Sequence, residues 1–129
     1  MSTLFSKIIR GEIPSYKVAE NKDFYAFLDI NPLQKGHTLV VPKQEVDYLF
    51  DLSDETLADM IVFSKSIAAK IKKVFPCDRV GMTVIGLEVP HAHIHLIPIN
   101  EESDMNFRSK RIKLREEELI KIADEIANA

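Results

Sequence analysis

Three of the four histidines in this chain occur at alternate positions, His91, His93 and His95. Side chains on a β-strand alternate between its two faces, so this spacing places three imidazoles on one face, about 6.6 Å apart. Imidazole titrates close to neutral pH, and such a row can therefore bind a metal ion, transfer protons or attack phosphorus. The pattern indicates a chemical site rather than the polar face of an ordinary strand.

Two kinds of chemistry use such a row. In a metal site, His-x-His pairs ligate zinc or iron, and Glu88 or His37 can supply a further ligand. The three imidazoles span about 13 Å, however, which is too far for all of them to reach one ion without a bend in the strand. In a phosphate site, one imidazole attacks phosphorus and its neighbours donate hydrogen bonds to the phosphate oxygens.

The elements that must position these histidines follow from hydrophobic periodicity and turn residues. The histidines belong to a predicted strand, His91–Ile99, whose other face carries Ala92, Ile94 and Leu96 as core residues. Short turns between the strands favour a mostly antiparallel sheet with helices gathered on one face, an α+β fold. Four further strands are predicted, over Tyr16–Glu20, Phe24–Ile30, His37–Val41 and Arg79–Ile85.

Three helices are predicted. The longest covers Asp54–Phe75, where apolar residues recur every three or four positions. Ser53 or Asp51 can cap its start, and Pro76 ends it. A short helix capped by Ser2 precedes Gly11, and an amphipathic helix begins at about Leu114.

Composition limits the class of protein. A chain of 129 residues that is 46% hydrophobic and 29% charged predicts one globular domain over residues 1–129. The net charge of −3 argues against a nucleic-acid-binding protein, and apolar runs fall short of the ~18 residues of a membrane span. Cys77 is the single cysteine, which excludes an internal disulfide and a multi-cysteine metal site, so we expect the cytoplasm as the compartment.

One basic run stands out near the C-terminus, at 108–113. Such a run can form a local phosphate-binding patch, or it can be a solvated loop in front of a helix. The sequence leaves both interpretations open.

The segment His91–Ile97 resembles the His-φ-His-φ-His-φ-φ signature of the histidine triad (HIT) superfamily, where φ is apolar. Leu4–Pro14 is similar to the N-terminal segment of the family's Hint-like branch, and Phe27–Pro32 and Gly36–Lys43 resemble its nucleotide-pocket strands. The resemblance extends from Leu4 to Asn100 and leaves residues 101–129 as a C-terminal extension with a helix.

The resemblance implies a HIT-like fold, in which a five-stranded antiparallel sheet carries a long helix. It also implies a two-fold homodimer with the helix of Leu57–Phe75 at the interface. The implied activity is that of a hydrolase or transferase acting at the α-phosphate of purine nucleotide conjugates of the adenosine 5′-phosphoramidate type, with no cofactor or catalytic metal. The alternatives are a dinucleoside polyphosphate hydrolase and a nucleotide-binding regulatory module with little turnover.

The same resemblance implies roles for individual residues. His93 matches the nucleophile, His91 and His95 match the histidines that orient it and bind the phosphate, and His37 completes the cluster. Asp29 matches the carboxylate that accepts hydrogen bonds from the ribose hydroxyls. The apolar cleft for the base is matched by five residues, Phe5, Ile8, Phe27, Ile30 and Leu39.

The chain departs from the Hint-like pattern in two places. The Gly-rich loop before the histidines is shortened to 85–90, and Glu88 stands where a hydroxyl residue is usual. We therefore assign Glu88 to the nucleotide site, where a carboxylate would suit a cationic leaving group such as an amine. Thr3 and Ser6 occupy the positions of the cysteines that bind a structural zinc in some bacterial relatives, so no such zinc is expected.

Overall fold

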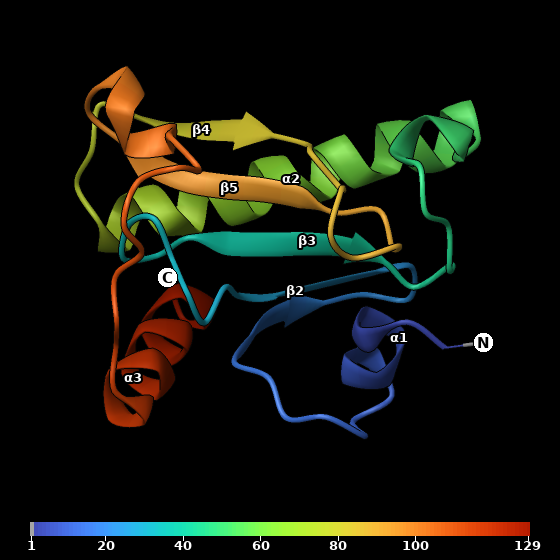
Figure 1. The fold of residues 1–129 in the computed structure, drawn as a ribbon, viewed down its shortest axis with the longest axis horizontal. Coiled ribbons are helices and arrows are strands. Elements are labelled where there is room, and N and C mark those ends of the chain that lie inside the picture. Colours follow the sequence, from blue (N-terminus) through green and yellow to red (C-terminus); the bar gives the residue numbers. More distant parts are fainter. Residues whose placement is uncertain (1) are drawn as a thin grey trace.

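The computed structural model describes residues 2–129, and its elements follow the predicted order (Figure 1). Two short 3₁₀ helices, η1 (Leu49–Asp51) and η2 (Glu102–Met105), add to that order. Among residues 2–129, none of the helices combines the length and the apolar character needed to cross a membrane. The strands are β1 (Lys17–Glu20), β2 (Phe24–Leu28), β3 (Thr38–Pro42), β4 (Arg79–Thr83) and β5 (Ile94–Ile99), and the helices are α1 (Leu4–Ile9), α2 (Asp54–Val74) and α3 (Glu116–Ala127).

The five strands form one sheet in the order β1-β2-β3-β5-β4, and every neighbouring pair is antiparallel. The predicted five-stranded antiparallel sheet is therefore confirmed. β5 lies between β3 and β4, and in this register His95 is opposite Leu39. β4 forms one edge of the sheet.

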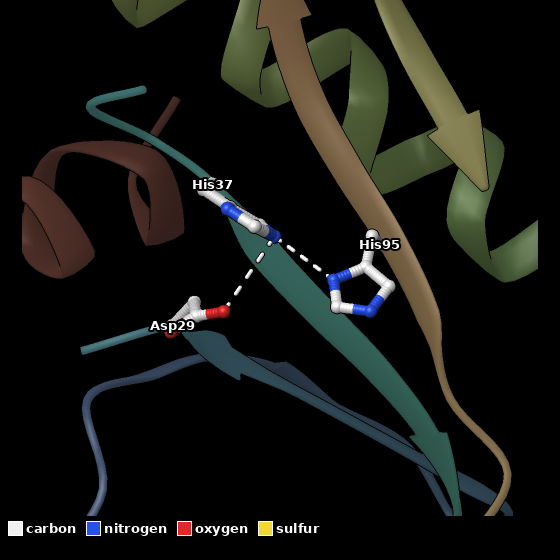
Figure 2. A group of neighbouring side chains, drawn as sticks. All are labelled: Asp29, His37 and His95. Atoms are coloured by element: carbon white, nitrogen blue, oxygen red, sulfur yellow. Dashed lines mark hydrogen bonds and ion pairs between the residues drawn. The ribbon is translucent and has the colours of Figure 1, made fainter. Parts of the chain in front are cut away.

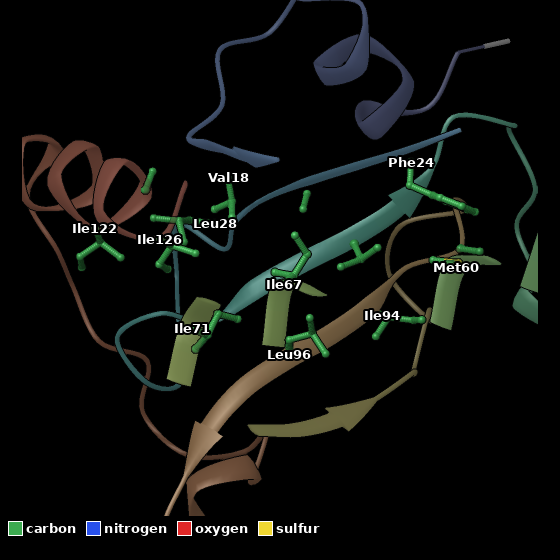
Figure 3. Close-up of a cluster of buried hydrophobic side chains, with 14 of the residues drawn as sticks. Val18, Phe24, Leu28, Met60, Ile67, Ile71, Ile94, Leu96, Ile122 and Ile126 are labelled. Carbon is green, nitrogen blue, oxygen red and sulfur yellow. The ribbon is translucent and has the colours of Figure 1, made fainter. Parts of the chain in front are cut away.

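One face of the sheet packs against α2 and α3 and holds the main core (Figure 3). Met60, Ile67 and Ile71 form the buried stripe of α2, as the three-and-four spacing predicts. Ser53 is its N-cap, with a side chain that accepts a hydrogen bond from the backbone N–H of Thr56. The residues that α3 contributes to the same core are Leu119, Ile122, Ala123 and Ile126.

The opposite face of the sheet is covered by α1, so the expectation that all helices gather on one face is wrong for this helix. Phe5 and Ile8 of α1 pack against Phe27 and Leu39, which alternate with the residues facing the main core. The N-cap is Thr3 rather than Ser2, because the Thr3 hydroxyl accepts the backbone N–H of Ser6.

Strand β5 begins at Ile94 and not at His91 as predicted. Before Ile94 the backbone bonds to loops instead of the ladder: Ala92 N–H donates to the Val46 carbonyl and His91 N–H to the Val89 carbonyl. The three histidines are therefore not one regular row on a strand. The other element ends lie within two residues of the predicted ones.

Gly36 is the residue whose backbone brings His37 to the start of β3, and its φ of +95° favours glycine. A Cβ at this position would meet the Phe75 ring at 2.8 Å, whereas a Cβ at Gly11, with φ +79°, would meet nothing within 4 Å. A side chain at either glycine would strain the backbone, but only one at Gly36 would also clash with a neighbouring residue.

We predict that Gly36→Ala destabilises the protein by about 2–3 kcal/mol, because the clash with Phe75 adds to the backbone strain. Gly11→Ala, the matched control, should cost only about 1 kcal/mol. Urea unfolding of both variants measures the difference. Equal losses would show that Phe75 moves aside freely.

Candidate functional site

A cavity of about 710 Å³ opens on the face of the sheet that α1 covers, in the size range of small-molecule sites. His93 and His95 lie in its wall, whereas His37 and His91 are completely buried and are not among its lining residues. The structure thus separates the four histidines into two that face the cavity and two that lie behind it. All seven residues predicted to bind the nucleotide line this cavity, namely Phe5, Ile8, Phe27, Asp29, Ile30, Leu39 and Glu88.

His93 is oriented by the backbone of the residue two positions before it. Its Nδ1 lies 2.8 Å from the carbonyl oxygen of His91, and because a carbonyl only accepts, Nδ1 carries the proton. In the neutral ring the lone pair is then on Nε2. The ring packs edge-on against Phe5, with centroids 5.0 Å apart, which limits its rotation. In its neutral form His93 therefore has an unprotonated nitrogen in a fixed orientation in the cavity wall.

His37 and His95 form a hydrogen-bonded pair with a defined direction (Figure 2). The backbone N–H of Leu33 donates to Nδ1 of His37, so the proton of this ring is on Nε2. That Nε2–H donates over 2.9 Å to Nδ1 of His95. The proton of neutral His95 is consequently on its Nε2, which makes His95 a hydrogen-bond donor in the wall of the cavity.

Burial keeps this pair neutral. It lowers the pKa of His37 to about 3, with further contributions from the charges of His95, Arg111 and His93. Burial likewise lowers the pKa of His95 to about 4, again assisted by the charges of His93 and Arg111. At neutral pH both rings are uncharged, and the tautomers set by the Leu33 N–H persist.

His91 makes both of its ring hydrogen bonds inside the protein. Nε2–H donates to the Pro42 carbonyl over 2.8 Å, and Nδ1 lies 2.7 Å from the Thr3 hydroxyl. Of the two functions predicted for His91, the geometry is compatible with the orientation of His93 and not with contact to a phosphate in the cavity. Burial also lowers the pKa of His91, which favours the neutral ring, whereas the Pro42 hydrogen bond and the Glu45 charge act in the opposite direction.

Thr3 and Ser6, the positions of the zinc-binding cysteines in some relatives, belong to a polar cluster with Glu45. One oxygen of the Glu45 carboxylate accepts from the Thr3 backbone N–H at 2.8 Å and from the Ser6 hydroxyl at 2.7 Å. Since Thr3 also contacts His91, this cluster links the start of α1 to the histidines. Sequence reasoning missed Glu45, because only the fold brings it within reach of residues some 40 positions away.

Asp29 lies in the cavity wall directly after β2. One of its oxygens accepts the backbone N–H of Asn31 at 2.8 Å, and the other is 3.7 Å from Nε2 of His37. Burial raises the pKa of this carboxyl, whereas the Asn31 hydrogen bond and the Arg111 charge act in the opposite direction. A carboxylate at this place suits a ligand that donates hydroxyl hydrogen bonds.

The group formed by Asp29, His37 and His95 has the residue types of a metal site, and its candidate ligand atoms lie within 4.8 Å of one another. A metal at Nε2 of neutral His37 would move the ring proton to Nδ1. That proton would then face the Leu33 N–H, two donors in opposition. The donor set therefore fits a hydrogen-bonded pair better than a metal centre.

Two residues beyond the segment matched at the sequence level also line the cavity. Phe107 packs against His95 with ring centroids 4.9 Å apart, and Arg111 lies over the Phe107 ring. Sequence reasoning did not assign either residue to the site. The signal available was the basic run at 108–113, which contains Arg111.

Comparison with known proteins gives consistent matches. The HIT domain family model matches residues 10–102. Adenosine 5′-monophosphoramidase HNT1 of Saccharomyces cerevisiae is 41% identical over 100 residues, which cover 77% of this chain and 63% of that protein. Adenosine 5′-monophosphoramidase hnt1 of Schizosaccharomyces pombe is 35% identical over 130 residues, covering 99% of this chain and 98% of that protein.

Among solved structures, the crystal structure of a Hit-like protein involved in cell-cycle regulation from Bartonella henselae superimposes with a TM-score of 0.84. It shares 36% identity and covers 98% of this chain and 95% of its own. The family match, the relative from Schizosaccharomyces pombe that is matched over nearly its full length, and the shared fold agree with one another: the chain belongs to the HIT family.

Proposed function

We propose that this protein is a nucleotide hydrolase or transferase that cleaves purine nucleotide conjugates of the adenosine 5′-phosphoramidate type at the α-phosphate. The observation that carries the proposal is the hydrogen bond from His93 Nδ1–H to the His91 carbonyl, which leaves the Nε2 lone pair for attack. The two HNT1 relatives, each named adenosine 5′-monophosphoramidase, support the same reaction class.

In the proposed reaction, Nε2 of His93 attacks the α-phosphorus, the P–N bond to the amine breaks, and the amine leaves after taking up a proton from solvent. Water then attacks the same phosphorus and loses a proton to solvent, the P–N bond to His93 breaks, and AMP and the neutral ring are released. His95 donates its Nε2–H to a phosphate oxygen as charge develops there. The ribose hydroxyls donate to Asp29.

The base fits the apolar end of the cavity. Phe5 and Ile8 of α1 pack against Phe27 and Leu39 of the sheet, and all four line the cavity. An aromatic base that lies against this apolar wall would bury apolar surface. Ile30, at the rim of the cavity, is 59% exposed and has room to contact a bound ligand. We propose that this apolar part of the cavity accepts a purine base.

His93→Ala should lower the turnover of an AMP–amine phosphoramidate by roughly 10³-fold or more, because no other nitrogen among the described cavity-lining residues carries the attacking lone pair. Turnover by the unaltered protein should persist in EDTA, and the variant should still bind AMP. Turnover that survives in His93→Ala would exclude the nucleophile assignment, and loss of activity in EDTA would favour a metalloenzyme. Cleavage of a dinucleoside tetraphosphate that is faster than cleavage of the phosphoramidate would favour the polyphosphate hydrolase. AMP binding without any turnover would favour the regulatory module.

Glu88 lines the cavity from the loop that follows β4. We propose that its carboxylate favours leaving groups that carry a positive charge. Glu88→Gln should then lower kcat/KM for the AMP phosphoramidate of a diamine about threefold, and leave that of a neutral monoamine unchanged.

The matched control for Glu88 is Glu55→Gln, the same charge change at an exposed position at the start of α2. It should leave the ratio between the two substrates unchanged. An equal effect of Glu88→Gln on both substrates would contradict a role in leaving-group selection.

We also propose that two copies of the chain associate along β4. This edge strand and the residues after it expose Met82, Val84 and Ile85, and Ile61 of α2 is also exposed. An apolar edge strand is a ready surface for pairing with a second copy. The rest of the α2 stripe is occupied by the chain's own core.

Light scattering should therefore give a mass twice that of the 14.7 kDa chain. Val84→Asp should shift the protein toward the monomer, whereas Ile120→Asp, at an exposed position on α3, should not. A monomeric unaltered protein would refute the proposed dimer.

Finally, we propose that residues 1–129 act as one domain in the cytoplasm. The support for one domain is that α3, from the C-terminal extension, shares a core with α2 and the sheet. The support for the compartment is the single cysteine, Cys77, which has no partner cysteine in the sequence.

A further inference from the structure

The segment after η2 turns back along the loop that follows β2, and two hydrogen bonds hold it there. The backbone N–H of Ile112 donates to the Pro32 carbonyl, and Arg111 Nη1 donates to the Asn31 carbonyl, each over 2.9 Å. These contacts join positions about 80 residues apart. They bring Arg111, part of the basic run at 108–113, to the wall of the cavity.

The Phe107 ring packs against the guanidinium of Arg111. The guanidinium carbon lies 5.3 Å from the centre of the Phe107 ring, a cation–π contact. The same ring packs edge-on against His95 and, at 6.2 Å, against His37. The guanidinium is thus held by a carbonyl and an aromatic ring, and its position relative to the histidines is defined.

Arg111 faces the carboxylate of Asp29. Its Nη1 lies 4.0 Å from Oδ2, the oxygen that does not accept the Asn31 N–H. The other titratable groups near Asp29 are the imidazoles of His37, His95 and His93. His37 and His95 are kept neutral by burial, so Arg111 is the permanent positive charge that faces this carboxylate.

The carboxylate needs that charge. Burial raises the pKa of Asp29, and a protonated Asp29 would lose much of its capacity to accept two hydroxyl hydrogen bonds. The Arg111 charge lowers the pKa of Asp29 and also those of His37 and His95. One guanidinium therefore favours both the ionised carboxylate and the neutral histidine pair.

We infer that Arg111 is a positioning residue that holds Asp29 in its ionised, hydrogen-bond-accepting form and thereby sets the preference of the site for ribose over dideoxyribose. The inference rests on the proposed nucleotide function, and it deepens that function by assigning sugar specificity to a residue of the C-terminal extension. Arg111 lies outside the part of the chain matched by the HIT domain model, residues 10–102.

The test measures binding of AMP and of 2′,3′-dideoxy-AMP by calorimetry between pH 5 and pH 8. Arg111→Gln should weaken AMP binding about fivefold near pH 5 and less near pH 8, and should change dideoxy-AMP binding little. Loss of the cation raises the pKa of Asp29. In the variant the carboxyl is therefore protonated, and ribose binding weakened, at a higher pH than in the unaltered protein. Arg111→Lys should restore most of the AMP affinity.

Two further variants isolate the interaction. Arg108→Gln removes the same charge from an exposed position in the same run and should leave the ratio of the two affinities unchanged. In an Asp29→Asn background, Arg111→Gln should have no additional effect on that ratio, because the group through which Arg111 acts is gone.

Several results would overturn the inference. Equal weakening of AMP and dideoxy-AMP by Arg111→Gln would mean that Arg111 contacts the phosphate, and an equal effect of Arg108→Gln would mean a general charge effect. An unchanged ribose preference in Arg111→Gln, with AMP binding intact, would refute the role of Arg111 and leave the proposed function standing. Absence of AMP binding by the unaltered protein would refute both.

Discussion

The hydrogen bond from the Leu33 backbone N–H to Nδ1 of His37 determines the protonation pattern of the cavity wall. Because a backbone N–H cannot accept, it forces the His37 proton to Nε2, and His37 in turn forces the proton of His95 to the nitrogen away from the pair. The His91 carbonyl has the corresponding effect on His93. One cavity wall thus holds an imidazole donor and an imidazole lone pair, and backbone groups maintain the difference between them.

This arrangement depends on burial as much as on hydrogen bonds. His37 and His91 are completely buried, and their desolvation disfavours the charged rings in which both nitrogens would be donors. Aromatic side chains contribute to that burial: Phe5 of α1 packs against His91, and Phe107 of the C-terminal extension packs against His37.

The C-terminal extension is part of the same electrostatic arrangement. Phe107 and Arg111 come from beyond the HIT domain match, yet they pack against His95 and Asp29. Of the two interpretations of the basic run, the solvated loop describes Arg108 and Lys110, which are exposed, whereas Arg111 lines the cavity. Neighbouring residues of one basic run therefore differ: some are solvated, and the one that faces the Asp29 loop is part of the site.

The amino-acid sequence by itself determined which residues alternate on each strand, because the period of two is a local property of the backbone. The apolar stripe of α2, with its helical period, and the order of the strands along the chain could be predicted from such local patterns. The seven cavity-lining residues assigned to the nucleotide were predicted through the resemblance to the HIT superfamily. Only the tertiary structure decided which histidines face the cavity, since this depends on contacts such as Thr3 with His91 and His37 with His95. It also decided that Ile94, and not His91, begins β5, and that Arg111 reaches Asp29. The contacts of His91, His95 and Arg111 join residues about 60 to 90 positions apart, where no local pattern carries the information.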